Sequence, residues 1–385
     1  MLQQAGFGSA PPVRRGRGVS GNVGNRFERF DTEPFDDGWA TILEEQLAPA
    51  AIATTLTRDR SRSALSWNDS PDLGFDRSVN PYRGCEHGCV YCYARPSHSY
   101  LGYSPGLDFE TRLTFKPEIA QILERELRRP GYTAKPVTLG SNTDPYQPVD
   151  RTLALTRQVL EVLERFGHPL SIVTKSAGVI RDIDILGRMA ARGLVRVWLS
   201  ITTLDPVLAR RMEPRAATPE RRLAAVTQLS AAGIPAGVLA APMIPGLNDA
   251  ELERILAAAS TAGAAHARYV LLRLPLELRQ MFETWLQQHY PARAKHVLNL
   301  IRETREGQLN DSRFGERFRG TGPYADLLSQ RFRQAALRNG LTEGGPLVTT
   351  HFAQPDVLSP GDAAPDRFRR GSTSRPDNGA QLALF

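Results

Sequence analysis

Apolar residues recur along the middle of the chain in two alternating patterns. Short runs of β-branched and aliphatic residues predict strands at Pro136–Leu139, Leu170–Thr174, Val195–Ile201, Ala236–Ala240 and Arg268–Leu272. Longer stretches, with apolar residues three and four positions apart, predict helices at Pro117–Arg128, Thr152–Phe166, Ile180–Ala191, Pro219–Ala232 and Ala250–Ala262. Such strand–helix alternation predicts a parallel sheet with helices packed outside it.

One more strand at Ser78–Tyr82 brings the total to about six βα units, which is too few for a closed eight-stranded barrel. After Leu274 the pattern becomes purely helical, at Leu276–His289 and Ala292–Glu306. The predicted fold class is therefore α/β: a partial (β/α)6 TIM-like barrel with C-terminal helices and disordered tails.

Composition divides the chain into five segments. Residues 1–38, rich in Gly, Arg and Asn, and residues 342–385, rich in Pro, Gly, Ser and Asp, predict disordered tails. Between the tails we expect an N-terminal extension at 39–74, the barrel core at 75–275 and a helical region at 276–341.

Net charge and cysteine content limit the partners and the cellular compartment that we expect for this chain. The 385 residues carry a net charge of +7, and the first tail is basic, with Arg14, Arg15, Arg17 and Arg26 ahead of any acidic residue. Such a tail suits nucleic acid, and equally a solubilising arm. No apolar run reaches the roughly 18 residues of a transmembrane helix, and no secretory signal is recognisable. Only three cysteines occur, within eight positions, so we predict no disulfide framework and a reducing cytoplasm.

Those cysteines are Cys85, Cys89 and Cys92, in the spacing C-x-x-x-C-x-x-C. Three thiolates on a compact loop can bind three irons of a four-iron cluster, leaving the fourth iron open to a small molecule. Gly84 and Gly88 allow the loop to turn tightly. A structural zinc site, with His87 or His98 as fourth ligand, and a chance group of buried cysteines are the alternatives.

This motif, with an aromatic residue between its last two cysteines, resembles the radical S-adenosylmethionine (SAM) superfamily. The tyrosines Tyr91 and Tyr93, and the pairs Thr174-Lys175 and Glu213-Pro214, resemble its spore-photoproduct-lyase-like (photolyase-like) branch of bacterial proteins, over roughly residues 75–275. The resemblance implies a [4Fe-4S] cluster and SAM as cofactors. It also implies reductive cleavage of SAM to a 5′-deoxyadenosyl radical that abstracts a hydrogen atom.

The resemblance, together with the position of residues at predicted strand ends, also implies site residues. Cys85, Cys89 and Cys92 would be the metal ligands. The expected cofactor-binding residues are Gly140, Ser141, Asn142, Lys175, Ser200, Glu213 and Gly246. Each of these has a structural alternative, such as a turn, a surface ion pair or a helix cap.

Tyr91 and Tyr93 are the candidate catalytic residues, although ring packing against the cluster would also account for them. The lyase that gives the branch its name is thought to return a hydrogen atom from an additional cysteine. No fourth cysteine exists here, and Ser141 lies in the corresponding neighbourhood. We therefore expect an enzyme of lyase or oxidoreductase class that is not simply a lesion lyase.

The chain ends in Gln381, Leu382, Ala383, Leu384 and Phe385, which resembles the peptide that binds the bacterial sliding clamp. Docking of this apolar end on its own domain is the alternative. Clamp binding by this peptide, together with the basic tail, favours a DNA substrate and a role in DNA repair or modification. Radical modification of a peptide or small metabolite, and a non-catalytic metal-binding module recruited by the clamp, are the competing hypotheses. Reduced flavodoxin or ferredoxin is the expected electron donor, and no membrane partner is expected.

Overall fold

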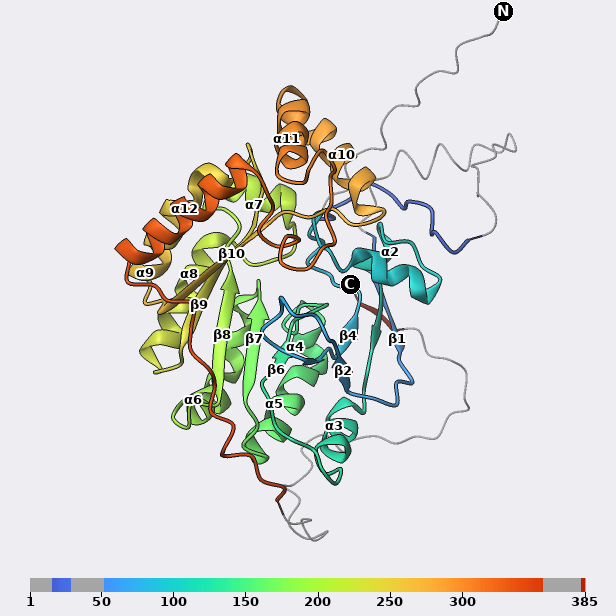
Figure 1. Cartoon of the computed structure of the whole chain (residues 1–385). Coiled ribbons are helices and arrows are strands. Elements are labelled where there is room, and N and C mark those ends of the chain that lie inside the picture. The colour runs from blue at the N-terminus through green and yellow to red at the C-terminus, as the bar shows by residue number, and fades with distance from the viewer. Residues whose placement is uncertain (1–15, 29–51, 356–381, 385) are drawn as a thin grey trace, which may run out of the picture.

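The computed structural model describes residues 16–28, 52–355 and 382–384. Its centre is a seven-stranded sheet in the order β10-β9-β8-β7-β6-β3-β2 (Figure 1). Its strands are β2 (Leu65–Trp67), β3 (Arg77–Val79), β6 (Val137–Leu139), β7 (Leu170–Thr174), β8 (Val195–Ser200), β9 (Ala236–Met243) and β10 (His266–Leu271). All are parallel except β2, which pairs antiparallel with β3. The sheet does not close, which confirms the predicted partial barrel.

The parallel register brings the carboxyl ends of the strands to one edge of the sheet. Val79 pairs with Leu139, Thr174 with Leu199, and Ser200 with Leu239. Strands β6 and β8 are buried along almost their whole length, as expected for strands covered on both faces. Polar residues that follow the strands therefore gather at this edge.

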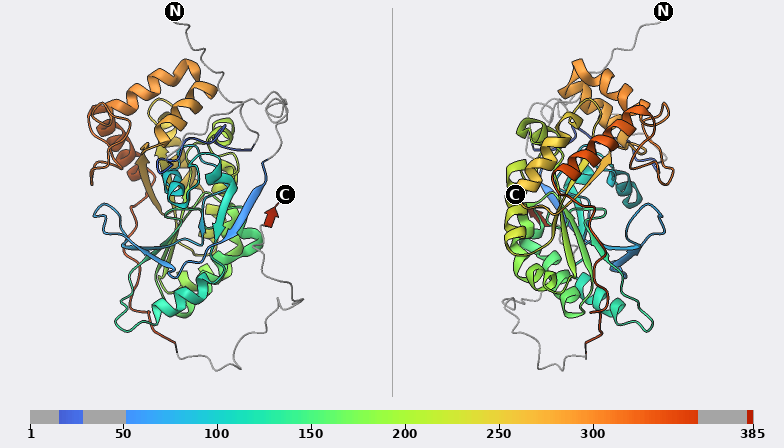
Figure 2. Two further views of the ribbon diagram at one scale, coloured as in Figure 1. Left: turned by 90° about the vertical axis from the view of Figure 1, so that its right-hand side faces the viewer. Right: turned by 60° about the vertical axis from the view of Figure 1, so that its left-hand side comes forward.

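Helices cover the outer face of the sheet (Figures 1 and 2). The main ones are α3 (Ile119–Leu127), α5 (Leu155–Arg165), α6 (Ile183–Ala190), α8 (Pro219–Ala231) and α9 (Leu252–Thr261). In α5 the apolar residues with no exposed surface are Val159, Leu160 and Leu163, which share one face of the helix. Full burial of each such side chain stabilises the fold by about 1.5–3 kcal/mol.

Shorter helices connect these elements. They are η1 (Arg95–Leu101), α2 (Asp108–Thr111), α4 (Asp150–Leu153), η2 (Ala177–Asp182), α7 (Pro206–Met212) and η3 (Asp249–Glu251). Helix α7 begins where the Asp205 side chain accepts hydrogen bonds from the amides of Val207 and Leu208.

The C-terminal region is helical, as α10 (Leu278–His289), α11 (Pro291–Glu303) and α12 (Pro323–Arg338). Helices α10 and α11 lie above the carboxyl edge of the sheet (Figures 1 and 2). Phe282 and Trp285 of α10 share one apolar cluster with Val90 and Tyr91 of the cysteine loop. None of the described helices is long and apolar enough to cross a membrane.

A second, smaller sheet was not predicted from the sequence. It has the order β11-β1-β5-β4, and its strands are β1 (Thr54–Arg58), β4 (Tyr82–Arg83), β5 (Arg112–Phe115) and β11 (Leu382–Leu384). Strand β4 leads directly into the cysteine loop. Strand β11 pairs antiparallel with β1, so Leu382 and Leu384 pair with the chain's own edge strand, while Gln381 and Phe385 lie outside the described residues.

The prediction of disordered tails is wrong for two described stretches. Residues 16–28 pack on the cysteine loop: Arg17 and Asn25 are buried, and the Gly18 amide donates to Glu110. Residues 342–355 run past the opposite edge of the sheet, where the ring of Phe352 contacts Tyr132 and the Ala353 amide donates to the Phe166 carbonyl. Long-range hydrogen bonds hold both stretches, and neither has the apolar periodicity from which its order could be predicted.

A buried ion pair between Glu213 and Arg222 ties the loop after α7 to the sheet. The side chains are 0% and 2% exposed. Arg222 also donates to the carbonyls of Ser200 and Ala217, both at 2.8 Å. The second oxygen of Glu213 accepts hydrogen bonds from Thr202, at 2.5 Å, and from Tyr91. Both charges are thus compensated inside the protein.

Replacement of Arg222 by Met is expected to lower the free energy of unfolding by about 3–5 kcal/mol, because Glu213 is left as a buried charge without a cation. Urea denaturation measures the effect. The matched control is Arg221→Met, because Arg221 is the exposed neighbour on the same helix, and it should change stability by no more than about 0.5 kcal/mol. Adding Glu213→Gln to Arg222→Met should recover much of the lost stability. Equal stability of Arg222→Met and Arg221→Met would contradict this interpretation of the ion pair.

Candidate functional site

The cysteine loop is shaped by two glycines with left-handed backbone. Gly84 has φ +78° and Gly88 has φ +66°, values that favour glycine over other residues. A Cβ on Gly84 would lie 2.9 Å from the Phe109 carbonyl oxygen, and one on Gly88 would lie 2.7 Å from Glu110 Oε2. The N-terminal segment packs tightly against this loop at Gly18, since a Cβ there would lie 1.6 Å from the Gly88 carbonyl oxygen.

Arg95 anchors this loop from beneath. It is fully buried, and its Nε donates to the Cys89 carbonyl at 2.8 Å. Its terminal nitrogens form an ion pair with Glu110 at 2.5 Å and donate to the carbonyls of Pro105 and Gly106. Sequence reasoning missed Arg95, although an arginine three positions after the last cysteine was the available signal.

The three thiols lie close enough to influence one another. Burial raises the pKa values of Cys85 and Cys89; neighbouring thiols add to this effect, whereas Lys175 opposes it at Cys89. Thiols in such a setting release protons when iron binds, so metal binding and ionisation are coupled. As a donor set, three free thiols within eight positions of one loop suit three irons of a four-iron cluster.

The histidines of the zinc alternative are engaged elsewhere. His98 Nε2 lies 3.1 Å from the Arg112 carbonyl, and its ring packs against Phe109. His87 Nδ1 lies 3.3 Å from Asp144 Oδ2. These contacts account for both rings without a metal ion.

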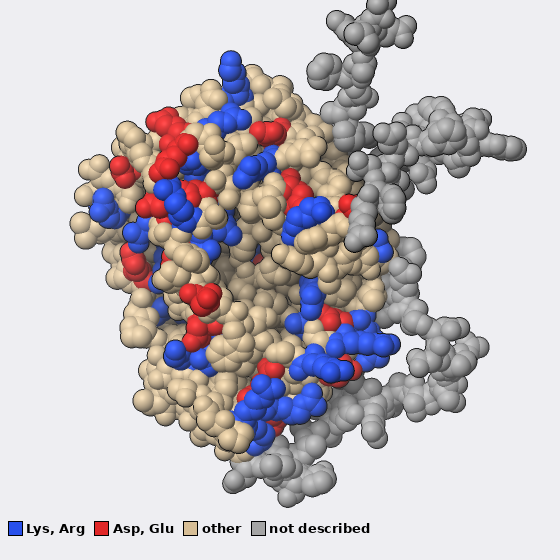
Figure 3. Space-filling view, turned by 45° about the vertical axis from the view of Figure 1, so that its right-hand side comes forward, with Lys and Arg blue, Asp and Glu red and all other residues tan. Residues whose placement is uncertain are grey.

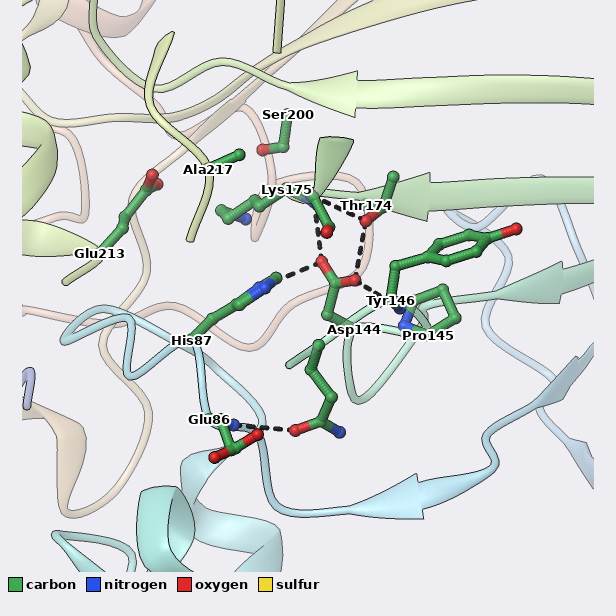
Figure 4. Close-up of polar contacts among 12 residues, drawn as sticks. Glu86, His87, Asp144, Pro145, Tyr146, Thr174, Lys175, Ser200, Glu213 and Ala217 are labelled. Carbon is green, nitrogen blue, oxygen red and sulfur yellow. Dashed lines mark hydrogen bonds and ion pairs between the residues drawn. The ribbon is translucent and has the colours of Figure 1, made fainter. Parts of the chain in front are cut away.

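Asp144 connects three parts of the site (Figure 4). Its carboxylate accepts hydrogen bonds from the Lys175 amide and the Thr174 hydroxyl, both at 2.7 Å, and it pairs with His87. Burial alone would raise the pKa of Asp144, but His87 and these hydrogen bonds outweigh it and lower the pKa to about 2. The carboxylate therefore holds the loop after β6, the end of β7 and the cysteine loop together.

The predicted segment Gly140–Asn142 lies at the carboxyl edge of the sheet. Gly140 has φ +87°, and a Cβ there would lie 2.0 Å from the Val173 carbonyl oxygen. Asn80, just before the cysteine loop, donates to the Ser141 hydroxyl at 3.1 Å and accepts from the Asn142 amide at 3.1 Å. Asn80 was therefore a missed positioning residue.

Lys175, Ser200 and Glu213 approach the same region from different elements (Figure 4). The Lys175 ammonium lies 5.7 Å from the centre of the Tyr91 ring, and it has no hydrogen bond or ion pair to any described residue. Ser200 donates to the Ala241 carbonyl at 3.0 Å, which leaves its oxygen able to accept. Both oxygens of Glu213 are already committed to Arg222, Thr202 and Tyr91.

The two predicted tyrosines have different surroundings. Tyr91 is buried, and its hydroxyl donates to Glu213 and lies 3.2 Å from the Thr202 hydroxyl. Tyr93 is 49% exposed, and its hydroxyl donates to the Ser141 carbonyl. Tyr93 is thus the one that presents a ring surface to a ligand.

Gly246 has φ +74°, and its amide donates to Asp249 at 2.8 Å. A Cβ there would lie 3.0 Å from Leu300 of α11. The structure places this glycine against the C-terminal helices, so its packing explains the residue type by itself.

Comparisons with known proteins place the chain among relatives. The sequence model of the Radical SAM superfamily matches residues 79–259. An uncharacterised protein of Mycobacterium tuberculosis (strain ATCC 25618 / H37Rv) is 39% identical over 280 residues, covering 70% of this chain and 82% of that one. An uncharacterised protein of Methanocaldococcus jannaschii is 27% identical over 221 residues, covering 57% and 79%.

Among solved structures, spore photoproduct lyase complexed with dinucleoside spore photoproduct has a TM-score of 0.53. It is 18% identical, and the match covers 74% of this chain and 81% of that one, so the likeness is one of fold. It agrees with the open parallel sheet and confirms the predicted architecture. Since the superfamily pattern spans the cysteine loop and strands β6 to β9, and a relative matches most of both chains, this protein belongs to the radical SAM superfamily of enzymes, which use a [4Fe-4S] cluster and SAM.

Proposed function

We propose that this enzyme abstracts a hydrogen atom from a nucleotide of DNA, in repair or modification. Cys85, Cys89 and Cys92 would hold the cluster. When bound, the cluster and SAM together supply the 5′-deoxyadenosyl radical that removes the hydrogen atom. Membership of an enzyme family argues against the alternative of a non-catalytic metal-binding module.

The described residues divide the task of holding SAM. The ammonium of Lys175 lacks a protein partner, and it suits the SAM carboxylate. The carbonyls of Gly140–Asn142 suit the amino group, and the Ser200 hydroxyl suits a ribose oxygen. Glu213 is assigned a positioning role instead, because its oxygens are committed to Arg222, Thr202 and Tyr91.

A thiol is not available to return a hydrogen atom to the substrate radical. The chain has only three cysteines, and all belong to the cluster loop. Tyr93 is the proposed relay, because its ring is half exposed and follows Cys92 directly. Tyr91 is less suited, since its hydroxyl is buried against Glu213.

A basic surface carries the choice of DNA. Lysine and arginine side chains gather at the lower right of the face in Figure 3. The exposed arginines of this part of the chain are Arg58 at the end of β1, Arg60 and Arg62 of the β1–β2 link, Arg125 of α3 and Arg129 just after α3. The link lies beside the cysteine loop, because Arg83 pairs with Asp59 at 2.8 Å. Arg60 and Arg62 have no acidic partner among the described residues, so they remain available to phosphates.

The dinucleoside bound by the structurally similar lyase supports the same substrate class. A reducing cytoplasm is the proposed compartment. Reduced flavodoxin or ferredoxin is the proposed source of the electron that the chemistry requires.

Replacement of both Arg60 and Arg62 by Gln is expected to weaken binding of a labelled DNA duplex. The slope of log K against log salt concentration should fall in magnitude by about 2, because two phosphate contacts are lost. Fluorescence anisotropy at several salt concentrations gives the slope. Arg254→Gln/Arg333→Gln, exposed on α9 and α12, removes the same charge elsewhere. An identical slope for the two double variants would argue against this surface.

The sliding clamp is a proposed partner of the C-terminal peptide, through Gln381, Leu382, Leu384 and Phe385. Because Leu382–Leu384 pairs with β1 in the structure, clamp binding requires this strand to leave its own domain. Short strands at a sheet edge exchange partners readily, since each pairs through few hydrogen bonds.

Replacement of Phe385 by Ala is expected to abolish recovery of this protein on immobilised clamp, because the aromatic anchor of the peptide is lost. Wild-type protein and Gln354→Ala, a change outside the peptide, should be recovered equally. Recovery of the Phe385 variant at the wild-type level would rule out this partner.

A further inference from the structure

A cationic side chain at the mouth of the barrel has no described role. Arg273 follows β10, so it lies at the same edge of the sheet as the cysteine loop. Its guanidinium carbon lies 5.2 Å from the centre of the Tyr93 ring, and Tyr93 directly follows Cys92. The guanidinium also lies 5.4 Å from the Phe318 ring. Contacts with two aromatic rings fix its position without neutralising its charge.

No described residue gives this guanidinium a hydrogen bond or an ion pair. Its Nε is buried and has no partner. Asp72, a carboxylate close enough to act on Arg273, is committed, because it binds Arg317 through two contacts of 2.5 and 2.8 Å. Arg305, also nearby, donates to the carbonyls of Leu272 and Glu316.

An unpaired cation in such a place is costly unless a ligand compensates it. Burial disfavours the charged guanidinium, and Arg317 adds repulsion. Arg273 therefore carries a positive charge that an anionic group of a ligand can neutralise. A guanidinium binds the two oxygens of a phosphate or a carboxylate in a fork.

The surroundings favour a phosphate of a nucleic acid over a carboxylate. Two aromatic side chains of this region are exposed: Tyr93, one of the two rings that contact Arg273, is 49% exposed, and Phe314 is 57% exposed. Phe314 lies 4.9 Å from the Arg317 guanidinium, which also contacts Phe318. Exposed rings beside cations are the arrangement that binds single-stranded or unstacked nucleotides.

We propose that Arg273, held between Tyr93 and Phe318, binds a phosphodiester next to the reacting nucleotide, which positions that nucleotide at the cysteine loop. The proposal rests on the proposed function and adds the residue that selects the substrate's charge. Lys175, a second cation at this edge without a hydrogen bond or ion pair to any described residue, is left for SAM.

The test uses the reconstituted, SAM-loaded protein and a short fluorescein-labelled oligothymidylate as probe. Arg273→Gln is expected to raise the Kd roughly tenfold to a hundredfold, because a charged hydrogen-bonding partner is lost. Arg273→Lys should lie between that variant and the wild type, since it keeps the charge but loses the fork. Arg333→Gln, an exposed arginine on α12, should bind as the wild type does. Iron content and thermal stability report folding of each variant.

Two comparisons identify the anion. An oligothymidylate with uncharged methylphosphonate linkages should bind the wild type weakly, and the ratio of its Kd to that of the natural strand should be smaller for Arg273→Gln than for the wild type. Displacement of the probe by polyglutamate as readily as by unlabelled oligothymidylate would overturn the phosphate assignment. Equal affinities of Arg273→Gln and Arg333→Gln would overturn the role of Arg273.

The outcomes separate this inference from the proposed function. If DNA stimulates formation of 5′-deoxyadenosine but Arg273→Gln binds the probe normally, only the inference fails. If Arg273→Gln loses the probe but DNA never stimulates turnover, the proposed function fails and the phosphate site stands. If the wild type binds no oligonucleotide, both fail.

Discussion

The fully buried ion pair between Arg95 and Glu110 is the constraint on which the site depends. Both side chains have no exposed surface, so each remaining donor and acceptor must be satisfied internally. Arg95 meets this demand through the carbonyl of Cys89, and Glu110 meets it through the amide of Gly18. The same contacts that solve the desolvation problem therefore fix the cysteine loop and fasten the N-terminal segment on it.

The cationic side chains near the carboxyl edge of the sheet fall into two groups, those with a carboxylate partner and those without one. Arg95 and Arg222 are buried cations with carboxylate partners, and they hold backbone carbonyls in place. Lys175 and Arg273 reach the same edge of the sheet without such partners among the described residues. Preorganised cations of this kind contribute binding energy, because the protein has already met the cost of placing them. The division predicts a ligand with two separate anionic groups, or two ligands with one each.

The sequence predicted the parts of the fold that repeat. Strands such as Val195–Ser200 are buried on both faces, and helices such as Leu155–Arg165 bury one face, so each leaves a clear pattern of apolar residues. The cysteine spacing predicts Cys85, Cys89 and Cys92 as the metal ligands, because an open four-iron cluster needs three thiolates. Strands as short as Tyr82–Arg83 carry no pattern, so the second sheet was missed.

Long-range contacts explain the other differences. Glu213 is predicted from the sequence as a cofactor-binding residue, and this stays a prediction; its ion pair with Arg222 was not foreseen, because the turn between α7 and α8 brings the two together. Arg273 lies in an apolar stretch of the sequence, and its candidate role as an anion-binding residue follows only from its contacts with the rings of Tyr93 and Phe318. Gly18 was interpreted as part of a disordered tail, whereas its missing side chain permits contact with Gly88.

Anaerobic reconstitution of the full chain with iron and sulfide tests the central claim most directly. The account predicts a brown protein with about four iron atoms per chain, which forms 5′-deoxyadenosine from SAM when a reductant is added. It also predicts that Cys85→Ala, Cys89→Ala and Cys92→Ala each lose both properties. A colourless protein that retains zinc and leaves SAM intact would contradict the account.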